Sequence, residues 1–135
     1  MALRRKVMVF LYRSAPALQV LLLKRAKADK GDWHPVTGNV EPHEHVRNAA
    51  VREVAEETGL AVEPEPLGLT FTYEHKGRRF HETAYAARAA PDDEVTLSEE
   101  HTDHRWLAPD EARAQLSWPE QQKALDLLAQ RYGPR

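Results

Sequence analysis

The chain has 135 residues, 41% of them apolar and 30% charged, and a formal net charge of −2. This length predicts a single domain over residues 1–135, and the near-neutral charge gives no argument for nucleic-acid binding. The chain has no cysteine, which excludes disulfides, thiolate metal ligands and a cysteine nucleophile.

Short apolar runs predict the first strands. The opening letters MALRRK lead directly into one such run, so we expect no signal peptide and no membrane span. Together with the lack of cysteine, this favours a cytoplasmic location. The expected strands are Val7–Tyr12 and Val20–Lys24, paired with each other, and Trp33–Val36, which leads into a loop.

A loop and a helix follow. Residues 38–44 contain Gly38, Asn39 and Pro42, which are turn formers, so we expect a loop there. Val46–Thr58 has no Pro or Gly and predicts a helix that Gly59 ends as a C-cap. The helical period gives two roughly opposite faces, one with Val51, Val54, Ala55 and Thr58, the other with Glu53, Glu56 and Glu57.

The second half of the chain predicts a hairpin and two more helices. Leu69–His75 and Arg79–Ala87 alternate in polarity around a Lys-Gly turn. A short strand is expected at Asp103–Leu107, then one helix from Pro109 to Leu116 and a last helix from Pro119. The last helix has an apolar stripe of Leu125, Leu128 and Tyr132. Strands on both sides of a helix, with a helix pair at the end, predict an α/β sandwich.

The acidic helix face is chemically informative. Three carboxylates on one surface repel one another unless a cation lies among them, and they occupy the C-terminal half of the helix, where the macrodipole disfavours negative charge. A solvated acidic face, with Arg47 and Arg52 nearby, is the alternative explanation for a bare pattern of this kind.

The spacing of the surrounding residues resembles a known family. The stretch from Gly38 to Leu60 reads GNVEPHEHVRNAAVREVAEETGL. It is similar to the Nudix hydrolase signature G-x5-E-x7-R-E-U-x-E-E-x-G-U, where U is a bulky aliphatic residue, at every fixed position. The resemblance implies an α/β/α sandwich around a mixed sheet and a site for Mg²⁺ or Mn²⁺.

The resemblance also implies residue roles. Glu53, Glu56 and Glu57 would bind the metal, and the carbonyl of Gly38 would join them. Glu53, or a carboxylate from elsewhere, would take the proton from water. The matching arginine, Arg52, orients a glutamate by a charge-assisted bond.

Two further groups follow from the same resemblance. Glu44 would tie the loop to the helix, and Gly59 ends the helix. In the segment LSEEHTDHRWL, Glu100 is the best match to a loop glutamate that completes the metal shell or acts as base, with Glu99 as the alternate. His101 and His104 could be zinc ligands, but without a third ligand at fixed spacing we expect solvated loop histidines.

Residues that would contact the substrate are less sharply defined. Arg78 and Arg79 follow the hairpin turn and could bind phosphate, or could simply be solvated. Glu82 could contact a base or pterin ring, or lie exposed on its strand. Trp33 could stack on a ring, or pack in the core, and the same two alternatives apply to Tyr73 and Phe80.

The subgroup resemblance concerns residues 32–41, DWHPVTGNVE, which are similar to the W-x-x-V-T-G-x-V-E segment of bacterial dihydroneopterin triphosphate pyrophosphatases. Glu100-His101, Trp106-Leu107 and Trp118 ahead of Gln121 and Ala124 resemble that subgroup too. The loop differs at Pro42-His43, where Gly commonly precedes the glutamate that matches Glu44.

Three functions are therefore considered. The first is a metal-dependent pyrophosphohydrolase that splits a nucleoside or pterin triphosphate into a monophosphate and pyrophosphate. The second is a hydrolase of dinucleoside polyphosphates, and the third is a non-catalytic nucleotide-sensing module. We expect a small nucleotide-like substrate, no nucleic acid and no membrane as partners, with a homodimer as one alternative for the oligomeric state.

Overall fold

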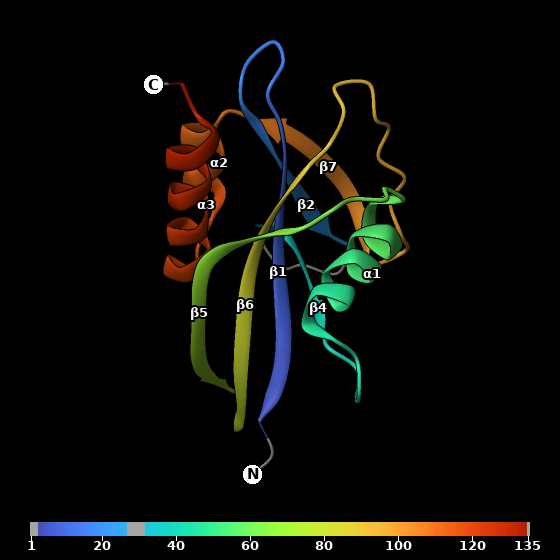
Figure 1. The fold of residues 1–135 in the computed structure, drawn as a ribbon, viewed down its shortest axis with the longest axis vertical. Coiled ribbons are helices and arrows are strands. Elements are labelled where there is room, and N and C mark those ends of the chain that lie inside the picture. The colour runs from blue at the N-terminus through green and yellow to red at the C-terminus, as the bar shows by residue number, and fades with distance from the viewer. Residues whose placement is uncertain (1–2, 27–31, 135) are drawn as a thin grey trace.

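A mixed sheet lies between helices on its two faces in the computed structural model, which describes residues 3–26 and 32–134 (Figure 1). The strands are β1 (Arg4–Arg13), β2 (Gln19–Arg25), β3 (Trp33–His34), β4 (Val36–Asn39), β5 (Glu65–His75), β6 (Arg78–Arg88) and β7 (His101–Leu107). The helices are α1 (Val46–Thr58), α2 (Pro109–Gln115) and α3 (Pro119–Tyr132). The predicted α/β/α sandwich around a mixed sheet is confirmed.

Strand β1 organises the sheet. It runs parallel to β6, from Arg4 beside Phe80 to Tyr12 beside Arg88. Its other edge is divided: Lys6–Val9 pair antiparallel with β4, whereas Tyr12 and Arg13 pair antiparallel with β2. Strand β2 in turn pairs with β3 and β7, and β5 pairs with β6 as the predicted hairpin. The sheet therefore splits beside β1, between β4 and β2.

Alternation along β1 and β2 builds two apolar cores. Val7, Val9 and Leu11 point to one face, where they pack with Ala50 and Val54 of α1. The intervening residues, among them Met8 and Phe10, point to the other face and pack with α2 and α3. Both faces are covered, so these strands read as continuous apolar runs rather than alternating ones.

Helix α1 has the bounds that the sequence predicts, and the structure shows which of its residues are buried. The buried residues are Ala49, Ala50, Val54, Glu57 and Thr58, whereas Ala55 is exposed and Val51 half-buried. The burial therefore does not follow the two faces of the helical period, because one residue of the acidic face, Glu57, is buried and one of the other face, Ala55, is exposed.

Several element ends also differ from the predictions. The segment Trp33–Val36 is interrupted at Pro35, and the second piece, β4, continues through Gly38 and Asn39, which pair with Val7 and Lys6. Gly38 is therefore in a strand and not in a loop. Gly59 does end α1, in the left-handed conformation at φ 75°.

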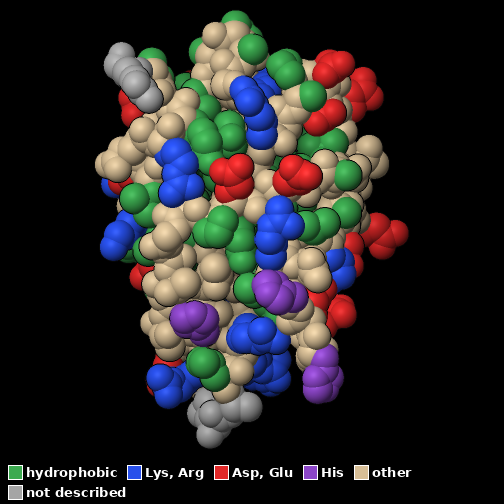
Figure 2. All heavy atoms as spheres, viewed as in Figure 1, with side chains coloured by type: hydrophobic (Ala, Val, Ile, Leu, Met, Phe, Trp, Pro, Cys, Tyr) green, Lys and Arg blue, Asp and Glu red, His purple; other side chains and the backbone are tan. Residues whose placement is uncertain are grey.

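In the view of Figure 2, acidic and basic side chains are interspersed, so neither charge dominates this face of the surface. Basic side chains are more frequent near the N-terminal end. Among the described residues, no helix has the length and apolar character that crossing a membrane requires.

Candidate metal and substrate site

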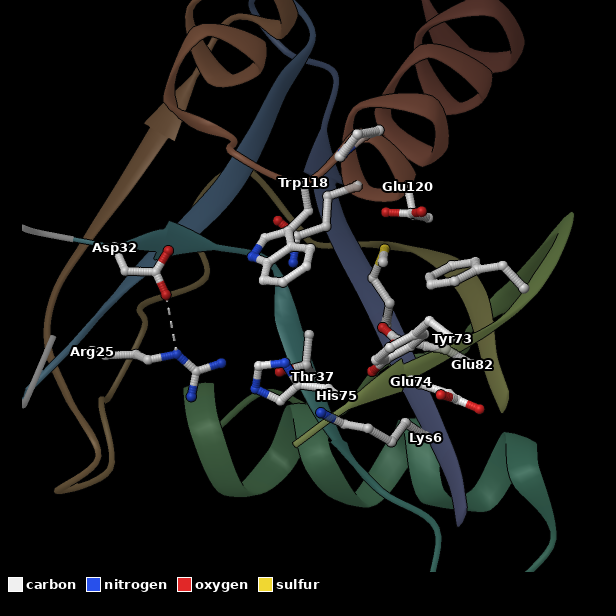
Figure 3. Close-up of a pocket in the computed structure, with 14 residues that line it drawn as sticks. Lys6, Arg25, Asp32, Thr37, Tyr73, Glu74, His75, Glu82, Trp118 and Glu120 are labelled. Atoms are coloured by element: carbon white, nitrogen blue, oxygen red, sulfur yellow. Dashed lines mark hydrogen bonds and ion pairs between the residues drawn. The ribbon is translucent and has the colours of Figure 1, made fainter. Parts of the chain in front are cut away.

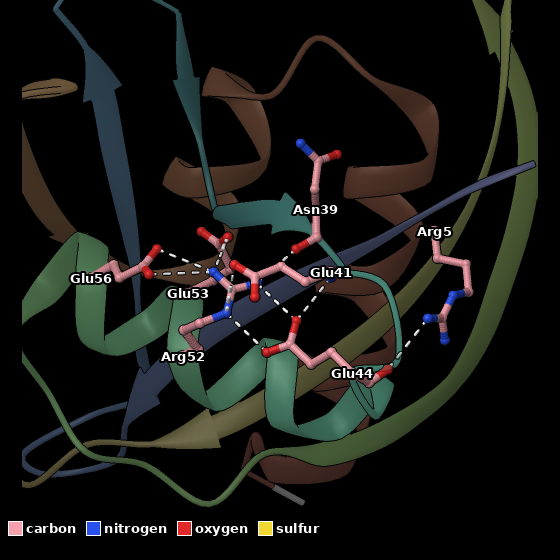
Figure 4. A network of polar contacts seen from close by, with 7 residues as sticks. All are labelled: Arg5, Asn39, Glu41, Glu44, Arg52, Glu53 and Glu56. Atoms are coloured by element: carbon pink, nitrogen blue, oxygen red, sulfur yellow. Dashed lines mark hydrogen bonds and ion pairs between the residues drawn. The ribbon is translucent and has the colours of Figure 1, made fainter.

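Arg52 of α1 is the centre of a polar network (Figure 4). Its Nε and Nη2 donate to the two carboxylate oxygens of Glu44, at 2.9 and 3.0 Å. Its Nη1 donates to Glu53 at 2.8 Å and to Glu56 at 3.2 Å, and its Nη2 also reaches the carbonyl of Asn39 at 2.8 Å. One guanidinium thus joins the helix to the end of β4 and to the loop that follows it.

Glu44 holds the loop in a fixed shape. Its Oε1 accepts the backbone N–H of Glu41 at 2.9 Å as well as the bond from Arg52. The hydrogen bonds from Arg52 and from the Glu41 backbone lower the pKa of Glu44 to about 2. The carboxylate is therefore ionised under all ordinary conditions, and it links the loop to the helix.

A cleft of about 290 Å³ lies beside this network. Every residue that the sequence assigned to metal binding lines it, namely Gly38, Glu53, Glu56, Glu57 and Glu100. Glu100 comes from a different part of the chain. Its carbonyl accepts the N–H of Ala26 at 2.8 Å, at the end of β2, and this bond holds Glu100 at the cleft. Glu99 does not line this cleft.

Gly38 is required by close approach rather than by its backbone angles. A Cβ placed on Gly38 would overlap the carboxyl carbon and Oε2 of Glu53. Any larger residue would therefore displace the Glu53 carboxylate, which is only 13% exposed.

Glu57 is the most deeply placed of these carboxylates. Burial raises its pKa strongly, the nearby Glu53 and Glu100 carboxylates raise it further, and Arg25 partly opposes the shift. A cation among these groups would remove the repulsion that causes part of this shift.

The donor set fits a hard divalent cation. Four carboxylates and a backbone carbonyl surround one cleft, and oxygen is the ligand type that such ions prefer. In the described part of the chain, however, no three of these side chains already converge as ligands do around an ion. Glu53 and Glu56 point to Arg52 instead, so binding would require their carboxylates to turn toward the cleft.

Two buried histidines lie behind Glu57. His101 Nε2 is 3.1 Å from His34 Nε2 and 3.8 Å from Glu57 Oε1, and His34 Nδ1 lies 2.5 Å from the Pro35 carbonyl. Since a carbonyl only accepts, His34 carries its proton on Nδ1, and His101 donates from Nε2. The prediction of a solvated His101 was wrong: the residue starts β7 and is 6% exposed.

Burial and the nearby Arg25 lower the pKa of His34 to about 3, and burial also lowers the pKa of His101. Both rings are therefore neutral near pH 7, which is consistent with their mutual hydrogen bond.

A second, larger cavity of about 420 Å³ opens on the face of the sheet that carries α3 (Figure 3). Its lining combines aromatic side chains, acidic groups and two cations. The residues are Lys6, Met8, Arg25, Asp32, Thr37, Phe71, Tyr73, Glu74, His75, Glu82, Trp118, Pro119, Glu120 and Gln121. In Figure 3, Arg25 and Asp32 lie on one side of it, and Tyr73 and Glu82 on the other.

The two cavities share Lys6, Arg25 and Thr37. Sequence reasoning missed these residues because a lysine and an arginine at strand ends carry no motif. The only sequence signal was their position at the polar ends of the two apolar runs that form β1 and β2.

The predicted substrate residues are placed differently from one another. Glu82 lines the larger cavity and is 4% exposed, so the alternative of an exposed strand position was wrong. Arg78 and Arg79 are exposed beside the β5–β6 turn, and neither lines these cavities. Trp33 is buried, under the guanidinium of Arg105 at 4.6 Å. For Arg78, Arg79 and Trp33, substrate contact stays a prediction.

The fold and the cleft together define a class of α/β/α proteins with a cluster of carboxylates at one end of a mixed sheet. A family model described as NUDIX domain matches residues 2–128, and the chain belongs to the Nudix family. It is accordingly a hydrolase that acts on pyrophosphate bonds, and Nudix hydrolases generally use a divalent metal.

Individual relatives carry different names. The chain is 31% identical over 106 residues to a bis(5'-nucleosyl)-tetraphosphatase of Caenorhabditis elegans, covering 76% of this chain and 77% of that protein. It is 33% identical over 119 residues to a dihydroneopterin triphosphate diphosphatase of Escherichia coli K12, covering 77% and 79%. A match to an octanoyltransferase of Myxococcus xanthus, 34% identical over 100 residues, spans 68% of this chain and only 27% of that longer protein.

The fold has close counterparts among solved structures. The C. elegans Ap4A hydrolase, solved as a binary complex, superposes with a TM-score of 0.83 at 26% identity, covering 94% of this chain and 96% of that one.

Replacing Arg52 with lysine should destabilise the protein even though the charge is kept. An ammonium cannot bind both oxygens of Glu44 while also reaching Glu53, so we expect a loss on the order of 1–3 kcal/mol in the free energy of unfolding. Denaturant titration measures it. Arg113→Lys is the matched control, because Arg113 binds Asp126 at an exposed site, where an ion pair contributes little, so this variant should lose less stability than Arg52→Lys. Equal losses in both variants would contradict the role of Arg52.

His34 should make stability depend on pH in the acid range. Its pKa is lower in the folded than in the unfolded state, so the unfolded chain binds more protons and stability falls as the pH drops from about 6.5 toward 3. In His34→Gln this slope should be shallower, as measured by unfolding at a series of pH values. His43→Asn, at an exposed position, should keep the wild-type slope. An unchanged slope in His34→Gln would refute the assignment.

Proposed function

We propose that this chain is a divalent-metal-dependent pyrophosphohydrolase that splits a nucleoside or pterin triphosphate into a monophosphate and pyrophosphate. The observation that carries the proposal is the junction of the two cavities. The acidic cleft and a cavity large enough for a ring meet at Lys6 and Arg25, two cations placed where a phosphate chain would run between them. A pocket of this volume falls in the usual range for small ligands, about 300–1,000 Å³.

We assign Glu53, Glu56, Glu57, Glu100 and the carbonyl of Gly38 to the metal, which we take to be Mg²⁺ or Mn²⁺. When bound, the cation neutralises phosphate charge and lowers the barrier to deprotonating water. Arg52 acts as a positioning residue, since its bonds to Glu53 and Glu56 hold these carboxylates beside the cleft.

The reaction consumes one water. Its oxygen forms a bond to one phosphorus of the α–β bridge, the bridging P–O bond breaks, and one proton of the water passes to a carboxylate of the cleft. Glu53 and Glu100 are the two candidates for this base. Glu53 is held against Gly38, whereas Glu100 is an exposed residue that lines the same cleft.

Lys6 and Arg25 are assigned to the substrate phosphates. Both line the acidic cleft and the larger cavity, so a triphosphate that reaches from one to the other passes both side chains. Charge-assisted hydrogen bonds from such groups both bind and orient a phosphate chain.

A dinucleoside polyphosphate is the second candidate substrate. It is supported by the C. elegans relative named as a tetraphosphatase and by the superposition on the Ap4A hydrolase. A non-catalytic sensing module is less well supported, because every glutamate of the predicted site is present and lines one cleft. Cytoplasmic location and a homodimer stay predictions.

A substrate panel tests the proposal. Nucleoside triphosphates, dihydroneopterin triphosphate, diadenosine polyphosphates and nucleotide sugars are incubated with the protein and Mg²⁺, and the products are resolved by mass. We expect monophosphate and pyrophosphate from a triphosphate. In Glu57→Gln, kcat should fall by about 1,000-fold, because charge stabilisation by a metal supplies several kcal/mol. Glu63→Gln, at an exposed position outside both cavities, should retain wild-type turnover. Turnover of diadenosine polyphosphates alone would overturn the choice of substrate, and normal turnover in Glu57→Gln would overturn the metal site.

Glu100 and Glu99 form a matched pair for the loop carboxylate. Glu100 lines the acidic cleft and Glu99 does not, although both are exposed neighbours. Glu100→Gln should lower kcat and kcat/KM together, because a metal ligand or a base acts mainly on the transition state. Glu99→Gln should change neither by more than about twofold. The reverse ranking would transfer the role to Glu99, and two neutral variants would leave Glu53 as the base.

A further inference from the structure

Glu82 is a buried carboxylate that the fold alone does not explain. It lies on β6 beside Lys6 of β1, is 4% exposed, and lines the larger cavity. Burying a carboxylate is costly unless hydrogen bonds compensate for the lost hydration. Because this carboxylate lines a cavity, a ligand in that cavity can supply further hydrogen bonds to it.

The existing partners of Glu82 are incomplete. Tyr73 Oη donates to Glu82 Oε1 at 2.8 Å, whereas Oε2 accepts no hydrogen bond from the part of the chain that the structure describes. Burial, the largest effect, and the nearby Glu120 carboxylate raise the pKa of Glu82, whereas the Tyr73 hydroxyl and the ammonium of Lys6 oppose this shift. Tyr73 and Lys6 thus both favour the ionised, acceptor-only form of the carboxylate.

Aromatic side chains flank this carboxylate. Tyr73 stacks between Phe71 and Phe80, with ring centroids 5.8 and 5.2 Å apart, and Phe71 and Tyr73 line the cavity. Trp118, just before α3, lines it too and is 51% exposed, an unusual exposure for a large apolar ring. These surfaces suit a flat ring that stacks on them and directs one edge to Glu82.

We propose that Glu82 selects rings whose edge presents two adjacent N–H donors, as the 2-amino-4-oxopyrimidine edge shared by guanine and pterins does. The inference rests on the proposed function and narrows its substrate class. One donor reaches Oε2 and the other reaches the remaining lone pair of Oε1, so both oxygens of the carboxylate are satisfied.

Adenine does not match this arrangement. Its equivalent edge has one amino donor next to a ring nitrogen that only accepts, and this nitrogen would face a carboxylate oxygen lone pair to lone pair. Hypoxanthine keeps the ring N–H but lacks the 2-amino group, so it offers one donor of the two. A site built to bond a polar group rejects an analogue that lacks it, because its own buried group is left unpaired.

The test compares kcat/KM for GTP, dihydroneopterin triphosphate, ITP and ATP. Wild type should prefer the first two over ITP and over ATP by at least about tenfold, and Glu82→Gln should bring the GTP/ITP and GTP/ATP ratios close to one. Tyr73→Phe keeps the ring but removes the hydroxyl that orients Glu82, so it should reduce both ratios partly. Glu63→Gln should preserve them. A preference for ATP, as expected if Glu82 were protonated, or ratios that survive Glu82→Gln, would overturn the inference.

Binding without turnover separates this inference from the proposed function. Affinities for GMP, IMP and AMP are measured by the fluorescence change of the protein, to which the exposed Trp118 should contribute. Tighter binding of GMP that is lost in Glu82→Gln supports the inference even if no triphosphate is cleaved, an outcome that refutes only the proposed reaction. Equal affinities for the three nucleotides refute the inference, whatever the turnover. Melting curves check that Glu82→Gln folds. If it does not, the affinities of Tyr73→Phe for the three nucleotides test the inference instead.

Discussion

The site depends on one electrostatic constraint: several carboxylates must coexist on one side of α1. Arg52 meets it by binding Glu44 with two nitrogens and Glu53 and Glu56 with a third. The same side chain holds the Asn39 carbonyl, so the end of β4 and the loop after it are fixed relative to the helix. Glu57 lies outside this arrangement and is left to the interior, where burial and its neighbours raise its pKa. The acidic groups are thus divided into those that bind Arg52 directly and one, Glu57, that is buried among other carboxylates with only partial compensation from Arg25.

The sheet determines how this acidic cleft is connected to the rest of the molecule. One edge of β1 pairs first with β4 and then with β2, so the sheet splits between β4 and β2. Lys6 before the split and Arg25 at the end of β2 line both cavities. The acidic cleft and the larger cavity, on the faces of the sheet that α1 and α3 cover, therefore meet at these two cations. A phosphate chain with a ring at one end would need such a junction.

Two buried carboxylates, Glu57 and Glu82, illustrate how environment assigns chemistry to the same side chain. Glu57 is surrounded by further carboxylates, so it suits a cation. Glu82 has a tyrosine hydroxyl on one oxygen and aromatic rings beside it, so it suits neutral N–H donors. The neutral histidine pair beside Glu57 adds no charge to the interior.

The sequence alone determined the local elements and the glutamate cluster. Helix α1, its left-handed end at Gly59 and the β5–β6 hairpin all follow from short-range preferences, which depend on neighbouring residues only. The helical period places Glu53, Glu56 and Glu57 on one face of the helix. Tertiary structure decided the rest. It turned Glu57 and Glu82 inward, buried His101 against His34, and brought Glu100 to the helix through the backbone of Ala26. It also placed Lys6 and Arg25 together across the split in the sheet, because strand pairing joins residues that no local pattern relates.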